Sequence, residues 1–152
     1  MTTKAQSSAG TVLSISAAAP ATYDAAGFAA VSYTAVAEVT DMGSFGKVFS
    51  LIAHNPVGDR KKYKLKGDYD NGKLALKLAK TTLANADAGQ TMLLAASNSD
   101  ADYTFSFRFQ DGSHAYMTGK VMSFTTMIST VNTILGADVQ VEVTSDIVET
   151  AL

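Results

Sequence analysis

The chain has 152 residues, the size of one ordinary domain, and carries 47% hydrophobic and 17% charged residues with a net charge of -2. This composition excludes an intrinsically disordered chain, which would combine low hydrophobicity with high net charge. The sequence contains no cysteine, which excludes disulfides and thiolate sites, and no run approaches the ~20 apolar residues of a membrane span, so we expect no membrane insertion by this chain.

The front of the chain predicts a flexible arm followed by strands. Residues 1–9 are small and polar, so we expect an arm there and a single β domain over residues 10–152. In residues 11–16, apolar and polar side chains alternate, which places Leu13 and Ile15 on one side of a strand. Residues 31–39 alternate in the same way, and the side chains expected on one face of that strand are Val31, Tyr33, Ala35, Ala37 and Val39.

The next segment predicts a β-hairpin with a long tip. The stretches GKVFSLIA (46–53) and KKYKLK (61–66) are typical strands, and the turn cluster HNPVGD (54–59) between them contains proline and glycine. The basic residues from Arg60 to Lys66 therefore lie on the return arm of this hairpin.

The stretch KLALKLAK (73–80) fits two structures. Leucine, lysine and alanine all favour helices, but the strict alternation and the preceding Asn71-Gly72 favour a strand.

A short helix follows at 87–97. Asp87 is expected to be its N-cap, with Gln90 three residues on as a variant of the capping box, and the shared apolar face is Met92, Leu93 and Ala96.

The last third of the chain predicts strands again. Residues 103–124 form a hairpin around an Asp-Gly turn, with an aromatic ladder of Tyr103, Phe105, Phe107 and Phe109 on its core face. In a final strand over 138–148, Val139, Val141 and Val143 point inward, which leaves Asp138, Gln140, Glu142 and Thr144 on the opposite face. Together the elements indicate a mainly β fold, an antiparallel sandwich or barrel with one short flanking helix.

Candidate catalytic groups are few. The two histidines, His54 and His114, both lie beside predicted turns, and neither belongs to a metal-binding spacing such as HExxH. The sequence contains no GxSxG nucleophile elbow. We therefore expect no enzyme activity and no catalytic residue.

Candidate ligand-binding motifs are also incomplete. The glycines at 43 and 46 lack the spacing of a phosphate-binding loop. Asp68 and Asp70 resemble the start of a calcium loop, but no glycine follows at its sixth place and no glutamate at its twelfth. We expect no metal and no cofactor.

The chain is electrically polarised around the hairpin. Arg60 to Lys80 holds eight of the twelve basic residues and only two of the fourteen acidic ones, so the other 131 positions carry four bases and twelve acids. The basic residues of the hairpin are Arg60, Lys61, Lys62, Lys64 and Lys66.

Three interpretations of this strip are open. With Tyr63 interleaved, it has the composition of a groove for single-stranded nucleic acid. It is also typical of a solvated edge strand, where lysines prevent stray pairing. The charge separation favours a third interpretation, in which a projecting hairpin docks on an acidic face of a neighbouring copy. We expect these five residues at a subunit interface.

The order of elements resembles the major tail tube proteins of long-tailed (siphovirus-type) bacteriophages. The matching stretches are PATYDAAGFAAVSYTAVAEVTDMGSFG, FSLIAHNPVGDRKKYKLKGDYDNGKLALKLA, DAGQTMLLAASNSDADYTFSFRFQDG and DVQVEVTSDIVE, which cover most of residues 10–149. Their sharpest features are the turn KGDYDNG, the helix start DAGQ and the FQDG hairpin. Some of these proteins carry an immunoglobulin-like C-terminal extension, and we expect none here.

This resemblance implies a structural virion protein with a sandwich-like fold, six copies per ring and rings stacked into a hollow tail tube. Its partners would be other copies of itself, a tape-measure protein, and tail terminator and initiator proteins. The tube would be assembled in the host cytoplasm, and the genome would pass through it without specific binding. We expect Asp138, Gln140 and Glu142 to face the lumen, because lysine or arginine there would hold the phosphates of passing DNA.

Two alternatives remain. The inner tube subunit of a bacterial contractile secretion system is similar in fold and ring architecture. A small nucleic-acid-binding β domain that uses residues 60–66 is the other alternative.

Overall fold

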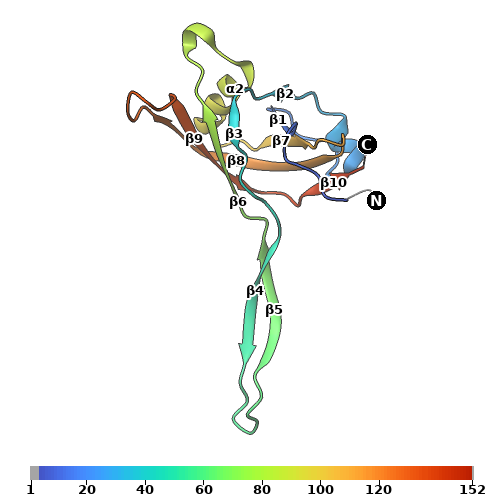
Figure 1. Cartoon of the computed structure of the whole chain (residues 1–152). Coiled ribbons are helices and arrows are strands. Elements are labelled where there is room, and N and C mark those ends of the chain that lie inside the picture. The colour runs from blue at the N-terminus through green and yellow to red at the C-terminus, as the bar shows by residue number, and fades with distance from the viewer. Residues whose placement is uncertain (1–3, 152) are drawn as a thin grey trace.

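The computed structural model describes residues 4–151, and strands dominate this part of the chain (Figure 1). The strands are β1 (Val12–Ser16), β2 (Thr34–Ala35), β3 (Val39–Asp41), β4 (Val48–His54), β5 (Tyr63–Asp70), β6 (Lys73–Ala79), β7 (Tyr103–Arg108), β8 (His114–Met127), β9 (Gly136–Val143) and β10 (Val148–Thr150). The helices are α1 (Ala25–Ala29), α2 (Ala88–Ser97) and the short 3-10 helix η1 (Leu83–Asn85).

All strand pairs are antiparallel, and they form one curled sheet plus a separate hairpin. The sheet has the order β2-β1-β7-β8-β9-β6-β3, with β10 beside the first half of β8. The hairpin of β4 and β5 projects from the body (Figure 1). The expected mainly β, antiparallel fold with a flanking helix and a projecting hairpin is confirmed.

The core lies on one face of the sheet and is covered by α2. The predicted alternation is confirmed in four strands, because the inward side chains of β1, β6, β7 and β9 are buried: Leu13, Ile15, Leu74, Leu76, Leu78, Phe105, Phe107, Val139, Val141 and Val143. Leu93 and Ala96 of α2 pack against them, both fully buried. Residues 73–79 are a strand paired with β9 along their whole length, so the helical alternative for this stretch is wrong.

The predicted continuous strand at 31–39 is wrong. The stretch holds only β2 and the start of β3, and Val36 is buried while the predicted inward residues Ala35 and Ala37 are exposed. Glu38 has a left-handed φ of 62°, which interrupts any strand. The backbone of Ala37 bonds to the start of α2, since its N–H donates to Asp87 Oδ2 at 3.2 Å.

Gln90 plays a different part from the capping box that the sequence predicts. Asp87 does cap α2, because its carboxylate accepts from the Gln90 N–H at 3.1 Å. The buried Gln90 side chain instead donates to the carbonyls of Ala37 (3.0 Å) and Ala79 (2.9 Å) and accepts from the Thr81 N–H (2.9 Å). It therefore joins α2 to the end of β6 and to the segment around Ala37, which is 53 positions away in sequence.

The predicted last strand is two strands. β9 ends at Val143, and β10 begins at Val148 and pairs with β8 at Tyr116. The connection, Thr144–Ile147, is held by the backbone of Thr118 in β8, which donates from its N–H to Ser145 Oγ (2.9 Å) and accepts at its carbonyl from the Thr144 N–H (2.9 Å). The hydroxyls of Thr118 and Thr144 also lie within hydrogen-bond distance, at 3.3 Å. Thr144 therefore does not continue the strand.

Helix α1 was not predicted from the sequence. Its N-cap Asp24 accepts from the Gly27 N–H at 2.7 Å, and its buried Phe28 stacks on Tyr116 of β8 with ring centroids 5.5 Å apart. The helix therefore covers the outer side of β8, opposite the core.

Of the expected N-terminal arm, residues 1–3 lie outside the described residues. Residues 4–9 are exposed, and residues 6–9 line a hollow beside β3.

Candidate subunit interface

The β4–β5 hairpin exposes large apolar side chains in a single copy of the chain. Within the described residues its strands pair only with each other, and every residue of the two strands except Gly67 is exposed. The exposed apolar side chains of the two strands, between 41% and 69% accessible, are Val48, Phe49, Leu51, Ile52, Tyr63, Leu65 and Tyr69. An isolated two-stranded hairpin is marginally stable in water, and exposed apolar surface of this kind marks an interaction site.

The strand register gives the hairpin two different faces. On the basic face, Leu51 lies opposite Lys66, and the Lys66 Nζ sits 4.6 Å from the ring centroid of Phe49. Lys64 belongs to this face, because cross-strand partners share a face and Lys64 pairs with Ala53. The apolar face consists of the pairs Ile52–Leu65 and His54–Tyr63.

The tip of the hairpin is longer than the sequence predicts. Because β5 begins at Tyr63, Arg60, Lys61 and Lys62 lie in the tip, residues 55–62, and only Lys64 and Lys66 lie on the return strand. Asp59 shapes this tip by accepting from the Tyr63 hydroxyl (2.7 Å) and the Lys61 N–H (3.0 Å). The bond from Tyr63 lowers the pKa of Asp59 and raises that of Tyr63.

All five predicted interface residues, Arg60, Lys61, Lys62, Lys64 and Lys66, are exposed on this hairpin. The other three bases of the basic stretch are elsewhere, since Lys73 and Lys77 lie on β6 and Lys80 directly follows it. The basic stretch therefore divides between the hairpin and the body of the protein.

The predicted lumen residues Asp138, Gln140 and Glu142 are partly exposed on the sheet face opposite the core. In the register, Asp138 lies opposite Lys77 of β6, and Glu142 lies between Lys73 of β6 and Lys120 of β8. Lysines therefore alternate with the acids across this face. Sequence reasoning missed this pattern because the lysines come from two other strands.

A carboxylate of the body anchors the base of the hairpin. Asp146, in the connection between β9 and β10, accepts from Asn71 Nδ2 at 3.1 Å and from the Tyr69 hydroxyl at 3.2 Å. The Lys47 Nζ lies 4.2 Å from the ring centroid of Tyr69. The bond from Asn71 lowers the pKa of Asp146, and Tyr69 and Lys47 lower it further. No local sequence pattern predicts this tie between residues about 75 positions apart.

A second exposed apolar surface lies at the turn between β8 and β9. The 17 residues from Val121 to Ala137 contain no charged side chain. The β8–β9 turn surface, as we call it, consists of Met122, Met127, Ile128, Val131 and Ile134, which are between 47% and 88% accessible. The long uncharged run was a signal in the sequence that could have predicted this surface.

The second half of β8 also has an open edge. The pairing with β7 ends at Gly119, and within the described residues the strand from Lys120 to Met127 pairs only with β9. The unpaired backbone of an edge strand is a template for a strand of another chain.

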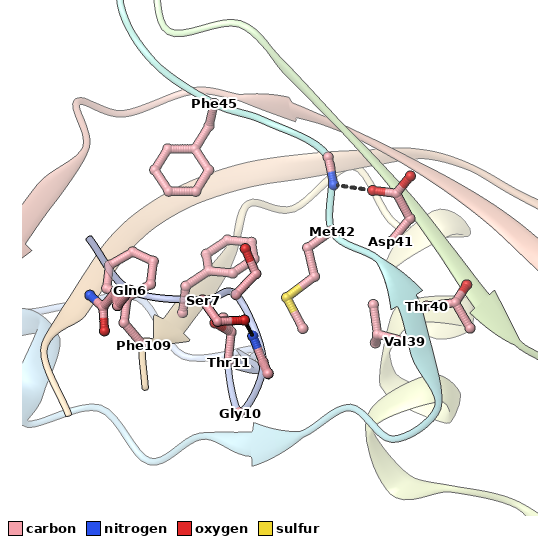
Figure 2. Close-up of a pocket in the computed structure, with 14 residues that line it drawn as sticks. Gln6, Ser7, Gly10, Thr11, Val39, Thr40, Asp41, Met42, Phe45 and Phe109 are labelled. Atoms are coloured by element: carbon pink, nitrogen blue, oxygen red, sulfur yellow. Dashed lines mark hydrogen bonds between the residues drawn. The ribbon is translucent and has the colours of Figure 1, made fainter. Parts of the chain in front are cut away.

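A hollow of about 670 Å³ lies between residues 6–11 and residues 39–45. Figure 2 shows Met42, Phe45 and Phe109 around it. Its one carboxylate, Asp41, accepts from the Gly43 N–H at 2.8 Å. The lining suits a segment of polypeptide better than a reacting small molecule, because it offers no second acid and no base beside Asp41.

Within residues 4–151, no three histidine, aspartate or glutamate side chains are grouped so that they could hold a metal ion. Neither α1 nor α2 of the described chain is long and apolar enough to cross a membrane.

No protein-family model and no curated protein sequence matches this chain. Several solved structures are similar in fold, including the following two. A chain of the six-fold symmetrised anti-feeding prophage baseplate is 10% identical, with a TM-score of 0.68 over 99% of this chain and 98% of that chain. A chain of the sheath/tube terminator of PVC, an extracellular contractile injection system, in its extended state is 11% identical, with a TM-score of 0.59 over 93% of both chains. At these identities the likeness establishes the shared fold.

Proposed function

We propose that this chain is a structural subunit that assembles into rings of six copies, and that these rings stack into the hollow tube of a phage-tail-like particle. The observation that carries the proposal is the free-standing β4–β5 hairpin, which exposes apolar side chains on both faces. The full-length likeness to a chain of a six-fold symmetrised baseplate supports the ring number.

The two similar structures named above come from an anti-feeding prophage and an extracellular contractile injection system. They favour the tube of a contractile particle over the tube of a long non-contractile phage tail. In either setting the protein has no catalytic role. Its partners would be other copies of itself, a tape-measure protein inside the tube, and terminator and initiator proteins at the tube ends.

In this assembly, Arg60, Lys61, Lys62, Lys64 and Lys66 contact acidic side chains of an adjacent copy. Each exposed pair contributes only ~0–1 kcal/mol, but the contact repeats six times in every ring. A stable contact buries about 800 Å² on each partner, and apolar side chains of the hairpin supply the area that the charges alone do not.

The lateral contacts within a ring use the open edge of β8, from Lys120 to Met127. Asp138, Gln140 and Glu142 face the lumen, together with Lys73, Lys77 and Lys120 on the neighbouring strands. A wall of alternating charges would not hold a passing polyanion as strongly as a basic wall does.

Nucleic-acid binding by the hairpin is less well supported. Tyr63, the aromatic residue within the basic strip, donates its hydroxyl to Asp59 at 2.7 Å, which places a negative charge beside the ring that a base would stack on.

Electron microscopy and sedimentation test the proposal. Negative-stain images of the purified protein, taken over a range of concentrations, should show rings or hollow tubes. A protein that sediments as a monomer at every concentration and salt level, even with the matching tube-end proteins added, would refute it. DNA binding by the free subunit that falls steeply with salt would instead support the nucleic-acid alternative.

A further inference from the structure

Exposed large apolar side chains are concentrated at two places in this protein. Of the 17 in the described chain, eight lie on the hairpin and its tip and five on the β8–β9 turn surface. Single exposed apolar residues are normal on a protein, but two such groups are not. Each group therefore needs a partner surface.

The two groups cannot cover each other within one chain. Figure 1 shows the hairpin extending away from the body, and the turn between β8 and β9 at the far end of the sheet. A contact between them joins two different surfaces on two copies, and such heterologous contacts generate rings or open stacks.

Charge selects which face of the hairpin fits the turn. The turn has no acid to pair with the lysines of the basic face, and burying an unpaired lysine costs free energy. The apolar face presents the pair Ile52–Leu65 at its centre. Charged groups lie at its tip end, where Lys61 Nζ is 5.5 Å from the ring centroid of Tyr63 and Asp59 accepts from the Tyr63 hydroxyl. The uncharged turn is therefore complementary to the apolar face.

The turn is held in shape before any contact forms. Thr133 donates from its hydroxyl to the Thr130 carbonyl at 2.7 Å, and its oxygen accepts from the Thr130 N–H at 3.0 Å. Val131, between them, is 88% accessible. A preformed apolar projection loses little conformational entropy on binding.

We propose that the β8–β9 turn surface of one copy packs against the apolar face of the hairpin of another copy. This inference rests on the proposed function, because it names the surface that receives the hairpin during assembly.

Thiol cross-linking tests the contact directly, since the chain has no cysteine of its own. A Leu65→Cys variant and a Val131→Cys variant, distinguished by mass, are mixed under assembly conditions and treated with a short bismaleimide. The matched control replaces Val131→Cys by Leu83→Cys, because Leu83 is 90% accessible and lies outside both surfaces. We expect Leu65–Val131 heterodimers well above the level of the Leu65–Leu83 control.

The outcomes separate this inference from the proposed function. If tubes form but the Leu65–Val131 cross-linked product is no more abundant than the Leu65–Leu83 product, the inference is wrong and the proposed function still stands. Absence of both assembly and cross-link overturns both.

A second pair of variants needs no cross-linker. Val131→Asp combined with Ile134→Asp should abolish assembly with an unchanged circular dichroism spectrum, because both side chains are at least 80% accessible in the single copy. Leu83→Asp should assemble normally. Normal tubes from the double variant would overturn the contact.

Discussion

Asn71, at the base of the hairpin, donates a hydrogen bond to Asp146 at 3.1 Å, although the two residues are 75 positions apart in sequence. Tyr69, two residues earlier, donates to the same carboxylate. This carboxylate ties the end of β5 to the β9–β10 connection, so we expect it to restrain the direction in which the hairpin leaves the body.

Replacing Asp146 with alanine should therefore loosen the hairpin while the core stays folded. The change can be measured with spin labels at Ala53→Cys and Leu83→Cys in the cysteine-free chain. We expect a broader distance distribution in the variant than in the parent. Asp68→Ala, an exposed acid within β5, is the matched control and should leave the distribution unchanged. Equal distributions in all three proteins would mean that the backbone alone directs the hairpin.

The same tie should depend on pH. The bond from Asn71 lowers the pKa of Asp146 below its ordinary 3.8. A carboxyl with a depressed folded pKa stabilises the fold above its unfolded pKa, and this contribution is lost as the pH falls through the folded value. The label distances should therefore be constant from neutral pH to about 4 and broaden below it. Asp146→Asn should show no such transition, and a parent protein without one would contradict the prediction.

Charge reversal on the hairpin should prevent assembly. Replacing Lys61, Lys62 and Lys64 together with glutamate presents like charges to the acidic partner surface, while the exposed positions keep the fold and its circular dichroism spectrum unchanged. The triple arginine variant keeps the charge and should still form tubes in electron micrographs. If the glutamate variant still forms tubes, the basic residues are not part of a subunit interface and belong only to a solvated edge strand.

Glu142→Lys should cost more stability than an ordinary surface substitution. Surface changes usually stay within ~0.5 kcal/mol. Here the new lysine would lie between Lys73 and Lys120, and like charges directly opposite each other in a sheet destabilise it. We expect a loss of about 1 kcal/mol in urea unfolding, from two such pairs. The Glu142→Gln variant should lose less free energy of unfolding. Equal losses in the two variants would argue against repulsion between the new lysine and its neighbours Lys73 and Lys120.

Gln90→Leu should be the most destabilising of these changes. The carbonyls of Ala37 and Ala79 and the N–H of Thr81 all lose their partner, and a buried unsatisfied polar group costs ~1–3 kcal/mol. We expect a loss of about 3 kcal/mol or more in the free energy of unfolding. The control Thr91→Ala changes the neighbouring, exposed position of α2 and should lower the free energy of unfolding far less. Similar losses in the two variants would show that Gln90 is replaceable.

Local patterns in the sequence determined most of the strands and the flanking helix. The alternation in residues 11–16, 73–79, 103–108 and 138–143 predicted the apolar core face of each strand, because successive side chains of a strand point to opposite faces of the sheet. In residues 103–108 the other face is buried as well, through Thr104 and Ser106. Asp87 predicted the start of α2 for an equally local reason, since a cap bonds only to the next few residues. The polarised charge and the projecting hairpin were also predictable from the sequence.

The tertiary structure decided which distant residues meet. The bonds of Ala37 to the start of α2, the lysines beside Glu142, and the tie between Asn71 and Asp146 all join segments that are far apart in the chain. Their partners are set by strand order and register, and a period of two reports only which face a residue occupies. The sequence by itself therefore determined the faces of the strands, while the packing of the whole chain determined what each face meets.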